Sequence, residues 1–346
     1  MKHQTTRYGE IPFYKIGTFG NTADAFISKK LFLEYRTKYS FPKKGDILIS
    51  ASGTIGRAVI YDGKPAYFQD SNIVWIDNDE TLVKNDFLFY AYSNVKWNTE
   101  YTTILRLYND NFRNTLIPLP PLNEQIAIAN ILSGLDRYLC ALDALIFKKE
   151  GVKKSLSFEL LSQRKRLKGF NQAWQRVRLG DIANYLTSNL SVEQITQQGK
   201  IKVYDVNNFI GYTDTTFISD KPYISIVKDG SVGRVRILPP KTNILSTMGA
   251  LIANHRTTTE FLFYLLSNFD FKNFISGSII PHIYFKDYKE KTIFLPPLNE
   301  QSTIANILST LDNEIASLKN KKRQFENIKK ALNHDLMSAK IRVLEK

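Results

Sequence analysis

Apolar residues recur at alternating spacings of four and three positions in two long stretches of the chain. The first stretch comprises Ile128, Leu132, Leu135, Leu139, Leu142, Ile146, Leu156 and Leu160. The second comprises Ile304, Leu308, Leu311, Ile315, Leu318, Phe325, Leu332 and Leu336. This spacing is typical of the seam of a coiled coil. It predicts two helices of about 40 residues, each roughly 60 Å long at 1.5 Å per residue.

Both predicted helices open on the same phrase. Leu-Pro-Pro-Leu-Asn-Glu-Gln occupies residues 119–125 and again 295–301, and 15 of the 18 residues in 119–136 recur 176 positions later. A proline pair is accepted in the first turn of a helix, and Glu124 and Glu300 then lie where the helix dipole favours negative charge. The duplication indicates two equivalent structural units.

One such helix could form a homodimer zipper, whereas two in a single chain can pair with each other. We expect an antiparallel intramolecular pair, because the intervening domain returns the chain. Four lysines interrupt the seam, and we expect them near helix ends or under a partner protein: Lys149, Lys153, Lys322 and Lys329. The residues expected to serve helix pairing or partner binding are Leu122, Asn123, Glu124, Gln125, Leu132, Leu139, Leu298, Asn299, Glu300, Gln301, Leu308 and Ile315.

The segments outside the helices favour short strands. β-rich runs occupy residues 46–50, 58–61, 72–76, 201–204 and 235–238. The expected fold class is α/β in the mixed α+β sense, with two domains of short-stranded mixed sheets joined by two long antiparallel coiled-coil helices. The expected boundaries are 1–118 for the first domain, 119–170 for the first repeat helix, 171–294 for the second domain and 295–346 for the second repeat helix.

The two domains also correspond to each other. Gly53-Thr-Ile-Gly-Arg57 matches Gly230-Ser-Val-Gly-Arg234, and Phe-Leu-Phe-Tyr occurs at both 87–90 and 261–264. We expect each Phe-Leu-Phe-Tyr segment to open a short helix that packs on the sheet. A common scaffold with divergent surfaces is the pattern expected when one fold reads two different targets.

Charge and composition indicate the class of partner. The 346 residues include 47 Lys and Arg against 33 Asp and Glu, a net charge of +14 that favours an anionic partner such as nucleic acid. The single cysteine, Cys140, excludes a disulfide framework and fits a reducing cytoplasm. The start of the chain has no apolar signal region, and no stretch has the length of a membrane helix.

No catalytic or metal-binding pattern emerges from the residues. The proline pairs at 120–121 and 239–240 do not continue as the motif of an amino-methyltransferase, and Gly63-Lys64 is followed by Pro65 rather than the Ser or Thr of a phosphate loop. The four histidines lie far apart and accompany no cysteine cluster. We therefore expect no catalytic residue, no metal and no cofactor bound by this chain.

The duplicated Leu-Pro-Pro-Leu-Asn-Glu-Gln phrase, with a Gly-Thr/Ser-Ile/Val-Gly loop in the domain before each copy, resembles the DNA specificity subunit of type I restriction–modification systems. The resemblance spans nearly the whole chain. It implies a non-catalytic cytoplasmic subunit of prokaryotes that reads a bipartite site in double-stranded DNA with two target-recognition domains. It also implies docking of two modification (methyltransferase) subunits on the helices, and a restriction subunit that translocates and cleaves. S-adenosylmethionine, ATP and Mg²⁺ would be used by those other subunits.

Side chains that read a major groove are Arg or Lys for guanine and Asn or Gln for adenine. Candidates in the first domain are Arg36, Lys38, Lys43, Lys44, Thr54, Arg57, Arg106, Asn109 and Arg113. Candidates in the second domain are Asn207, Asn208, Lys228, Ser231, Arg234, Arg236, Asn254, His255, Arg256 and His282. Arg57 and Arg234 follow matched turns, so we expect them to contact the DNA backbone. The residues without counterparts, 207–208 and 254–256, are the better candidates for base readout.

The start of the chain departs from the family pattern. The second domain begins Trp174-Gln-Arg-Val-Arg-Leu-Gly-Asp-Ile182, 25 residues before Gly199, whereas only eight residues precede Gly9. We expect the opening strand and helix of the first domain to be missing. This keeps open an assembly or inhibitory subunit that occupies modification subunits without reading DNA. A standalone DNA-binding regulator is a third interpretation.

Overall fold

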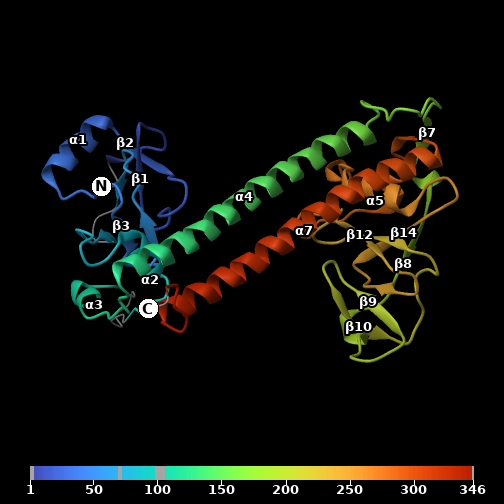
Figure 1. The fold of residues 1–346 in the computed structure, drawn as a ribbon. Coiled ribbons are helices and arrows are strands. Elements are labelled where there is room, and N and C mark those ends of the chain that lie inside the picture. The colour runs from blue at the N-terminus through green and yellow to red at the C-terminus, as the bar shows by residue number, and fades with distance from the viewer. Residues whose placement is uncertain (1–3, 69–71, 98–105, 345–346) are drawn as a thin grey trace. The chain divides into compact units, whose positions relative to one another are not determined.

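The computed structural model describes residues 4–68, 72–97 and 106–344, and the chain divides into two compact units. The first unit comprises Met1–Asp143 and Asn320–Lys346, and the second comprises Ala144–Lys319. Each unit therefore contains one α/β domain together with part of both long helices (Figure 1).

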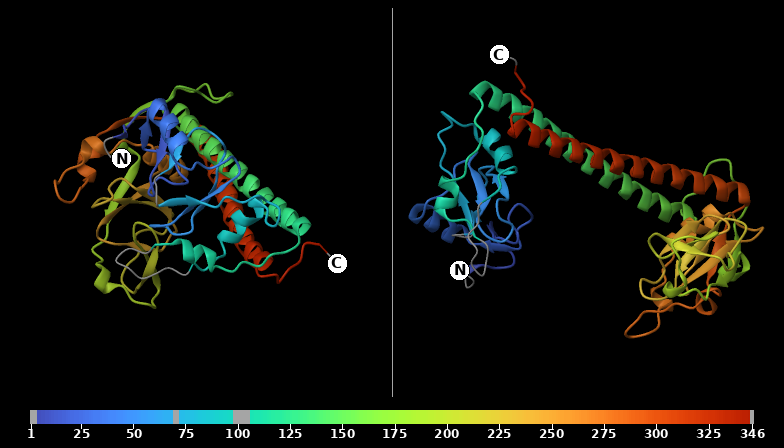
Figure 2. Two further views of the ribbon diagram at one scale, coloured as in Figure 1. Left: turned by 90° about the vertical axis from the view of Figure 1, so that its left-hand side faces the viewer. Right: turned by 90° about the horizontal axis from the view of Figure 1, so that it is seen from below.

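The long helices are α4, Leu122–Leu161, and α7, Leu298–Met337, and each is 40 residues long, as the seam pattern predicts. Their seam side chains are buried or half-buried, including Ile128 and Leu132 in α4 and Leu336 in α7. The views in Figure 2 show the two helices running side by side. No helix within the described ranges is both long and apolar enough to cross a membrane.

Ion pairs between α4 and α7 show that the helices are antiparallel within each unit. The first unit has Lys329–Asp136 at 2.5 Å and Lys322–Asp143 at 2.7 Å. The second unit has Lys319–Glu150 at 2.6 Å, Lys149–Glu314 at 2.7 Å and Lys153–Asp312. The numbers rise on one helix as they fall on the other. All four seam lysines face a carboxylate of the opposite helix, and these ion pairs accommodate them within the seam. Cover by a partner protein stays a prediction.

The domain of the first unit holds two three-stranded sheets, with strand orders β2-β1-β5 and β4-β3-β6. The strands are β1 Ile11–Tyr14, β2 Ala25–Ile27, β3 Ile47–Ser50, β4 Ala58–Ile60, β5 Tyr67–Phe68 and β6 Ile73–Trp75. The helices are α1 Lys29–Lys38, α2 Asn85–Tyr92 and α3 Asn109–Arg113. Helix α2 lies between sheet and long helix, because Leu88 and Tyr92 pack on β3 while Phe87 packs with Ile128 and Leu132 of α4.

The domain of the second unit holds three sheets, with strand orders β10-β9-β13, β12-β11-β14-β8 and β15-β7. The strands are β7 Gln175–Arg178, β8 Ala183–Thr187, β9 Ile201–Tyr204, β10 Phe209–Thr213, β11 Tyr223–Val227, β12 Val235–Leu238, β13 Asn243–Ile244, β14 Met248–Ala253 and β15 Thr292–Leu295. The helices are α5 Thr259–Ser267 and α6 Phe285–Tyr288, with 3-10 turns η2 Leu179–Asp181, η3 Val192–Gln194 and η4 Lys272–Phe274. Phe261 of α5 shares one buried cluster with Ile304 and Leu308 of α7, as Phe87 of α2 does with α4.

The two domains therefore share a scaffold, as the sequence predicts. The set β3, β4, β6 and α2 corresponds to β11, β12, β14 and α5, and β1 pairs with β2 as β9 pairs with β10. The clearest difference is at the start of the second domain. Strands β7 and β8 have no counterpart among the described residues of the first unit.

The matched glycine turns close the β3–β4 and β11–β12 hairpins in the same conformation. Gly53 and Gly56 have φ of 68° and 80°, and Gly230 and Gly233 have φ of 83° and 80°. Side chains avoid this left-handed region, and an aromatic ring adds a second reason for glycine at the second position. A Cβ on Gly56 would lie 2.2 Å from Nε1 of Trp97, and one on Gly233 would lie 2.7 Å from Cδ2 of Phe271.

The ion pair between Lys329 and Asp136 should stabilise the helix pair measurably, because both side chains are only partly exposed, at 26% and 39%. A double-mutant cycle with Lys329→Ala and Asp136→Ala should give a coupling of about 0.5–1 kcal/mol in urea unfolding. The matched pair Lys153–Asp312 should give a similar coupling. The Lys43–Asp77 pair, 76% and 78% exposed, is the control and should give almost none. Equal couplings in all three cycles would contradict this account.

Replacing the two glycines of one turn should separate backbone strain from ring contact. Gly230→Ala should cost about 1–2 kcal/mol in unfolding free energy, since only the left-handed φ opposes it and no atom lies within 4 Å of the added Cβ. Gly233→Ala should cost more, because the new methyl group would also displace Phe271. The measurement is urea unfolding of the two variants side by side, and a smaller cost at Gly233 would show that the ring does not enforce the turn.

Candidate functional site

A turn between β9 and β10 in the second unit gathers several of the predicted DNA-binding residues. The Asp205 carboxylate accepts hydrogen bonds from the backbone N–H groups of Asn207 and Asn208 at 2.7 and 2.6 Å, which shapes the turn. Nη2 of Arg234 donates to Oδ1 of Asn207 at 2.9 Å, and Nη1 of Arg236 donates to the Asn207 carbonyl at 2.8 Å. Two arginines from the β11–β12 hairpin and its strand therefore meet an exposed asparagine turn.

Aromatic side chains that the sequence reasoning missed extend this cluster. The Arg236 guanidinium lies 5.0 Å from the ring centre of Tyr204, and the Lys202 ammonium lies 6.0 Å from that of Phe209. Phe209 is 43% exposed. Basic and aromatic groups side by side suit a nucleic-acid surface, since one neutralises phosphate and the other stacks. The signal for this cluster in the sequence was a basic and an aromatic residue two positions apart on one strand, Lys202 and Tyr204.

The tip of the β11–β12 hairpin carries a second group. Nδ1 of His282 lies 2.8 Å from Oδ1 of Asp229, and the backbone N–H of Gly230 donates to the Pro281 carbonyl at 2.9 Å. These contacts hold the segment before α6 against the turn. Lys228 and exposed Ser231 belong to the same turn, so three predicted residues, Lys228, Ser231 and His282, are brought together here.

In the first unit the matched arginine has an internal partner. Nη1 of Arg57 donates to the Phe19 carbonyl at 2.9 Å, and the side chain is half-buried. Phe19 lies in the turn between β1 and β2, which corresponds to the turn containing Asn207 in the second unit. Arg57 and Arg234 therefore each tie the hairpin to the first turn of the neighbouring sheet. Contact with a DNA backbone remains a prediction for both residues.

The other candidates of the first unit fall into separate groups. Arg36, Lys43 and Lys44 line one hollow with Phe41 and Tyr61. Exposed Thr54 lies in the matched turn, and Arg106 forms a β-bridge with Ser52 beside it. The remaining candidates are exposed and lie on the two short helices: Lys38 at the end of α1, and Asn109 and Arg113 in α3. The structure thus does not gather the nine candidates of the first unit into one surface.

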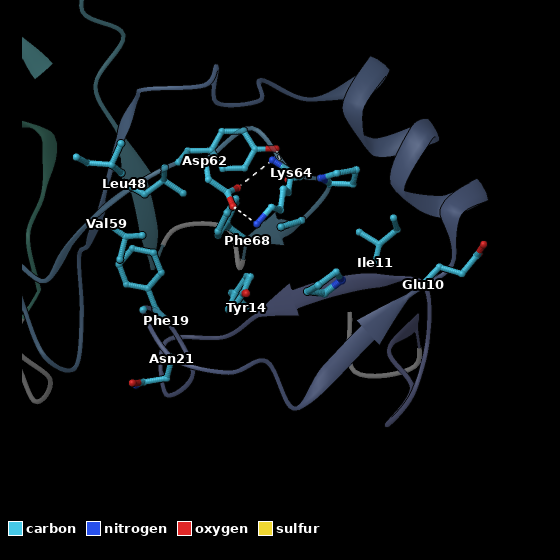
Figure 3. Close-up of a pocket in the computed structure, with 16 residues that line it drawn as sticks. Glu10, Ile11, Tyr14, Phe19, Asn21, Leu48, Val59, Asp62, Lys64 and Phe68 are labelled. Carbon is cyan, nitrogen blue, oxygen red and sulfur yellow. Dashed lines mark hydrogen bonds and ion pairs between the residues drawn. The ribbon is translucent and has the colours of Figure 1, made fainter. Parts of the chain in front are cut away.

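A hollow of about 620 Å³ lies between the two sheets of the first unit (Figure 3). Tyr14, Phe19 and Phe68 supply aromatic walls, and Asp62 pairs with Lys64 across it at 3.2 Å. The backbone N–H of Lys64 and the lysine ammonium hold the pKa of Asp62 below its usual value.

Residues 254–256, predicted to read bases, lie at the junction with α7. Asn254 uses its amide to bind the Asp181 carbonyl at 2.9 Å and its oxygen to accept from the backbone of Arg256 at 3.0 Å. The Arg256 side chain donates to Oε1 of Gln175 at 3.2 Å, while His255 is exposed. The bonds of Asn254 are those of a loop-shaping residue, and a base contact by this triplet stays a prediction.

The repeated Glu-Gln dipeptide is buried rather than available to a partner. Gln125 donates to the carbonyls of Leu82 and Pro120 and accepts from the backbone N–H of Lys84. Gln301 makes the matching three bonds, to Arg256, Pro296 and Thr258. Each glutamine thus joins its long helix to the loop that leads into the short helix of its domain.

The adjacent glutamates bind arginines near the ends of the opposite helices. Glu124 accepts two bonds from Arg342, at 2.7 and 2.6 Å, and these hold the pKa of its carboxyl below the usual value. Glu300 accepts from Arg166 at 2.7 Å and from the indole of Trp174 at 2.9 Å. All four Glu and Gln side chains are at most 2% exposed, so the contacts that they make in the structure are internal ones.

The other residues of that prediction divide between the seam and the surface. Leu132 and Leu308 are fully buried, Ile315 is 7% exposed and Leu139 is half-buried. A part in helix pairing stays a prediction for these four residues. Four residues are exposed at the helix starts: Leu122, Asn123, Leu298 and Asn299. Among the described residues, no group of three His, Cys, Asp or Glu side chains could hold a metal ion.

Known proteins of one kind match this chain. A sequence profile for the type I restriction modification DNA specificity domain matches residues 1–146 and 171–327. A putative type I restriction enzyme specificity subunit from Haemophilus influenzae is 64% identical over 137 residues, which are 39% of this chain and 36% of that protein. The putative MjaX specificity subunit from Methanocaldococcus jannaschii is 28% identical over 337 residues, covering 86% of this chain and 79% of the relative. The chain thus spans little more than a third of the first relative's length.

Solved structures share the fold. The type I restriction–modification S subunit from M. genitalium superposes with a TM-score of 0.61 at 20% identity, covering 97% of this chain and 91% of that one. A chain from a study of the assembly and conformational transition of the type I system gives 0.52 at 16% identity, with 85% and 82% covered. Because the profile matches well over half of the residues, the chain belongs to the type I restriction modification DNA specificity domain family, the specificity subunits of type I restriction–modification systems.

Proposed function

We propose that this chain reads a bipartite site in double-stranded DNA, one half with each unit, and contributes no catalytic residue. This proposal rests on one contrast. The attachment of each domain to its long helix is the same in both units, whereas the exposed turn beside the matched arginine differs. Both units attach their domain to a long helix through the same three glutamine bonds, yet the turn beside the matched arginine presents Asn207 in one unit and the Phe19 carbonyl in the other. Two blocks of different sequence, separated by unread base pairs, follow from two such surfaces.

The long helices supply the docking surface for two modification subunits in this proposal. Apolar side chains point to solvent along them, as the 80% exposed Phe147, the 45% exposed Val152 and the 51% exposed Ile328 show. Exposed apolar groups of this size on a helix are typical of a protein interface. A restriction subunit would join the same assembly, and S-adenosylmethionine, ATP and Mg²⁺ would be bound by the partner subunits.

The alternative is a subunit that occupies modification subunits without reading DNA. The observation that favours it is the absence, among the described residues of the first unit, of counterparts to β7 and β8. Such a unit would leave one half-site unread.

Co-expression with the type I modification subunits of the same cell should decide between the two. We expect a complex with two modification subunits per chain, seen by native mass spectrometry, and methylated adenines in a two-block motif in the sequenced methylome. Phe147→Asp should weaken assembly, because it places a charge in the interface, whereas the exposed control Lys148→Ala should not. A stable complex that methylates a one-block motif, or none, would favour the alternative.

Single substitutions should separate backbone contacts from base contacts. Arg57→Ala and Arg234→Ala should weaken binding about equally on all DNA sequences and lower the salt slope by about one. Asn208→Ala and Arg256→Ala should each cost about 1–3 kcal/mol on cognate DNA and relax specificity at one position of the second half-site. Lys64→Ala, which removes a lysine already paired with Asp62, is the control. Fluorescence anisotropy at several salt concentrations measures all five, and uniform losses on every sequence would show that no base contact was removed.

A further inference from the structure

The segment after η4 in the second unit closes into a tight loop with two isoleucines at its tip. The backbone N–H groups of Ser276 and His282 each donate to the other residue's carbonyl, at 2.9 and 2.7 Å. Gly277 has a φ of 87°, and a Cβ there would lie 2.3 Å from the Ile280 carbonyl oxygen. Ile279 is 92% exposed and Ile280 is 55% exposed. The loop, in orange in Figure 2, therefore presents two apolar side chains to solvent from a hydrogen-bonded backbone.

This loop is fixed to the matched glycine turn between β11 and β12. The backbone N–H of Ile283 donates to the Lys228 carbonyl at 2.9 Å, directly after the residue that closes the loop. Nδ1 of His282 lies 2.8 Å from Oδ1 of Asp229, so the acidic group of the turn already has a partner. Exposed Ser231 belongs to the same turn. The isoleucine tip is thus held beside residues that the sequence predicts to bind DNA.

Basic side chains surround the loop in the chain and in space. Lys272 of η4 precedes it, Lys286 of α6 follows it, and Lys228 lies in the turn to which it is fixed. Within the described ranges, none of these three lysines forms an ion pair with a carboxylate. The Lys286 ammonium lies 5.4 Å from the ring centre of Tyr284, which is 49% exposed. Cations of this kind can bind phosphates on both sides of the tip.

We propose that Ile279 and Ile280 form a wedge that inserts between two stacked base pairs of DNA at the half-site of the second unit. Proteins that kink DNA insert apolar side chains such as isoleucine between base steps and use basic groups beside them. A protein partner fits the tip less well, because two side chains offer far less than the roughly 800 Å² that each partner buries in a stable interface. The wedge rests on the proposed function, since it needs the second unit to bind DNA.

The wedge would add sequence preference without a hydrogen bond to a base. Insertion unstacks one base step and bends the duplex there, and pyrimidine–purine steps unstack most easily. The second half-site should therefore favour a TA, CA or TG step at the position of the wedge. The corresponding segment of the first unit includes residues 98–105, which lie outside the described residues, so the wedge is assigned to the second unit alone.

The first measurement is the bend of the cognate duplex in the complex with modification subunits. Dyes at the two ends of the duplex report the bend by resonance energy transfer. The double variant Ile279→Ala/Ile280→Ala should bind DNA with a smaller bend than the wild type, whereas Ile279→Phe keeps an apolar wedge and should keep the bend. The control is Phe217→Ala, because Phe217 is also exposed, at 45%, but lies before β11 at the end of that strand opposite to the turn.

The second measurement locates the wedge by moving a single mismatch through the second half-site. A mismatch lowers the cost of unstacking at its step, so one position should tighten binding of the wild-type complex by roughly tenfold. The double alanine variant should show no such position, since it has no side chain to insert. Binding is followed by fluorescence anisotropy at one fixed salt concentration. The step found in this way should be a pyrimidine–purine step in the methylated sites of the cell.

The possible results separate the wedge from the function on which it rests. Equal bends and equal mismatch responses in the wild type and the double alanine variant, with specific binding intact, would overturn the wedge and leave the proposed function standing. Absence of specific DNA binding by the wild-type complex would overturn both. Loss of modification subunits from the double variant in native mass spectrometry would make the tip a protein contact and overturn the wedge. Circular dichroism melting verifies that the variants fold, and the single variant Ile279→Ala at the more exposed position gives the same test.

Discussion

The buried glutamate–glutamine pair at the start of each long helix is the contact on which the rest of the architecture depends. A glutamine amide satisfies two carbonyls and one N–H of the neighbouring backbone, so it joins helix and domain without leaving a buried polar group unpaired. The adjacent glutamate binds an arginine near the end of the other helix, which adds charge-assisted bonds in a nearly enclosed site. The Glu-Gln dipeptide of the repeated phrase therefore forms the joint between helix and domain in both halves.

The helix pair uses charge inside its seam for a related reason. An uninterrupted apolar seam leaves register and direction poorly specified, whereas lysines that face carboxylates in antiparallel order stabilise one arrangement. Asp136 and Asp312 occupy equivalent positions, and each binds both a seam lysine and a tyrosine, Tyr90 or Tyr264, of the short helix in its domain. Helix pairing and domain attachment are thus coupled at the same carboxylate in each unit.

The two domains differ outside the residues that attach each domain to its long helix. The turn between β1 and β2 differs in length and composition from the turn between β9 and β10. The matched arginine binds a polar group of this turn in each unit, the Phe19 carbonyl or the Asn207 side chain. A scaffold of this kind permits a change of surface without disturbing the core, because the variable residues lie in exposed turns and the shared ones lie in buried helices and strands.

Periodicity and repetition were enough to predict the two helices, their length, their direction and the matched glycine turns. The helices and the matched turns depend on local patterns, since a four-three spacing or a pair of glycines is visible within a few residues. The direction followed from the repeat, because the domain between the two copies returns the chain. The tertiary structure alone decided that the seam lysines pair across the helices, that Glu124 and Gln125 are buried, and that Asn254 shapes a loop. It also brought Asn207, Arg234 and Arg236 together from two separate hairpins. Partners far apart in the sequence set burial and hydrogen bonding, and no local pattern records which distant group a side chain will meet.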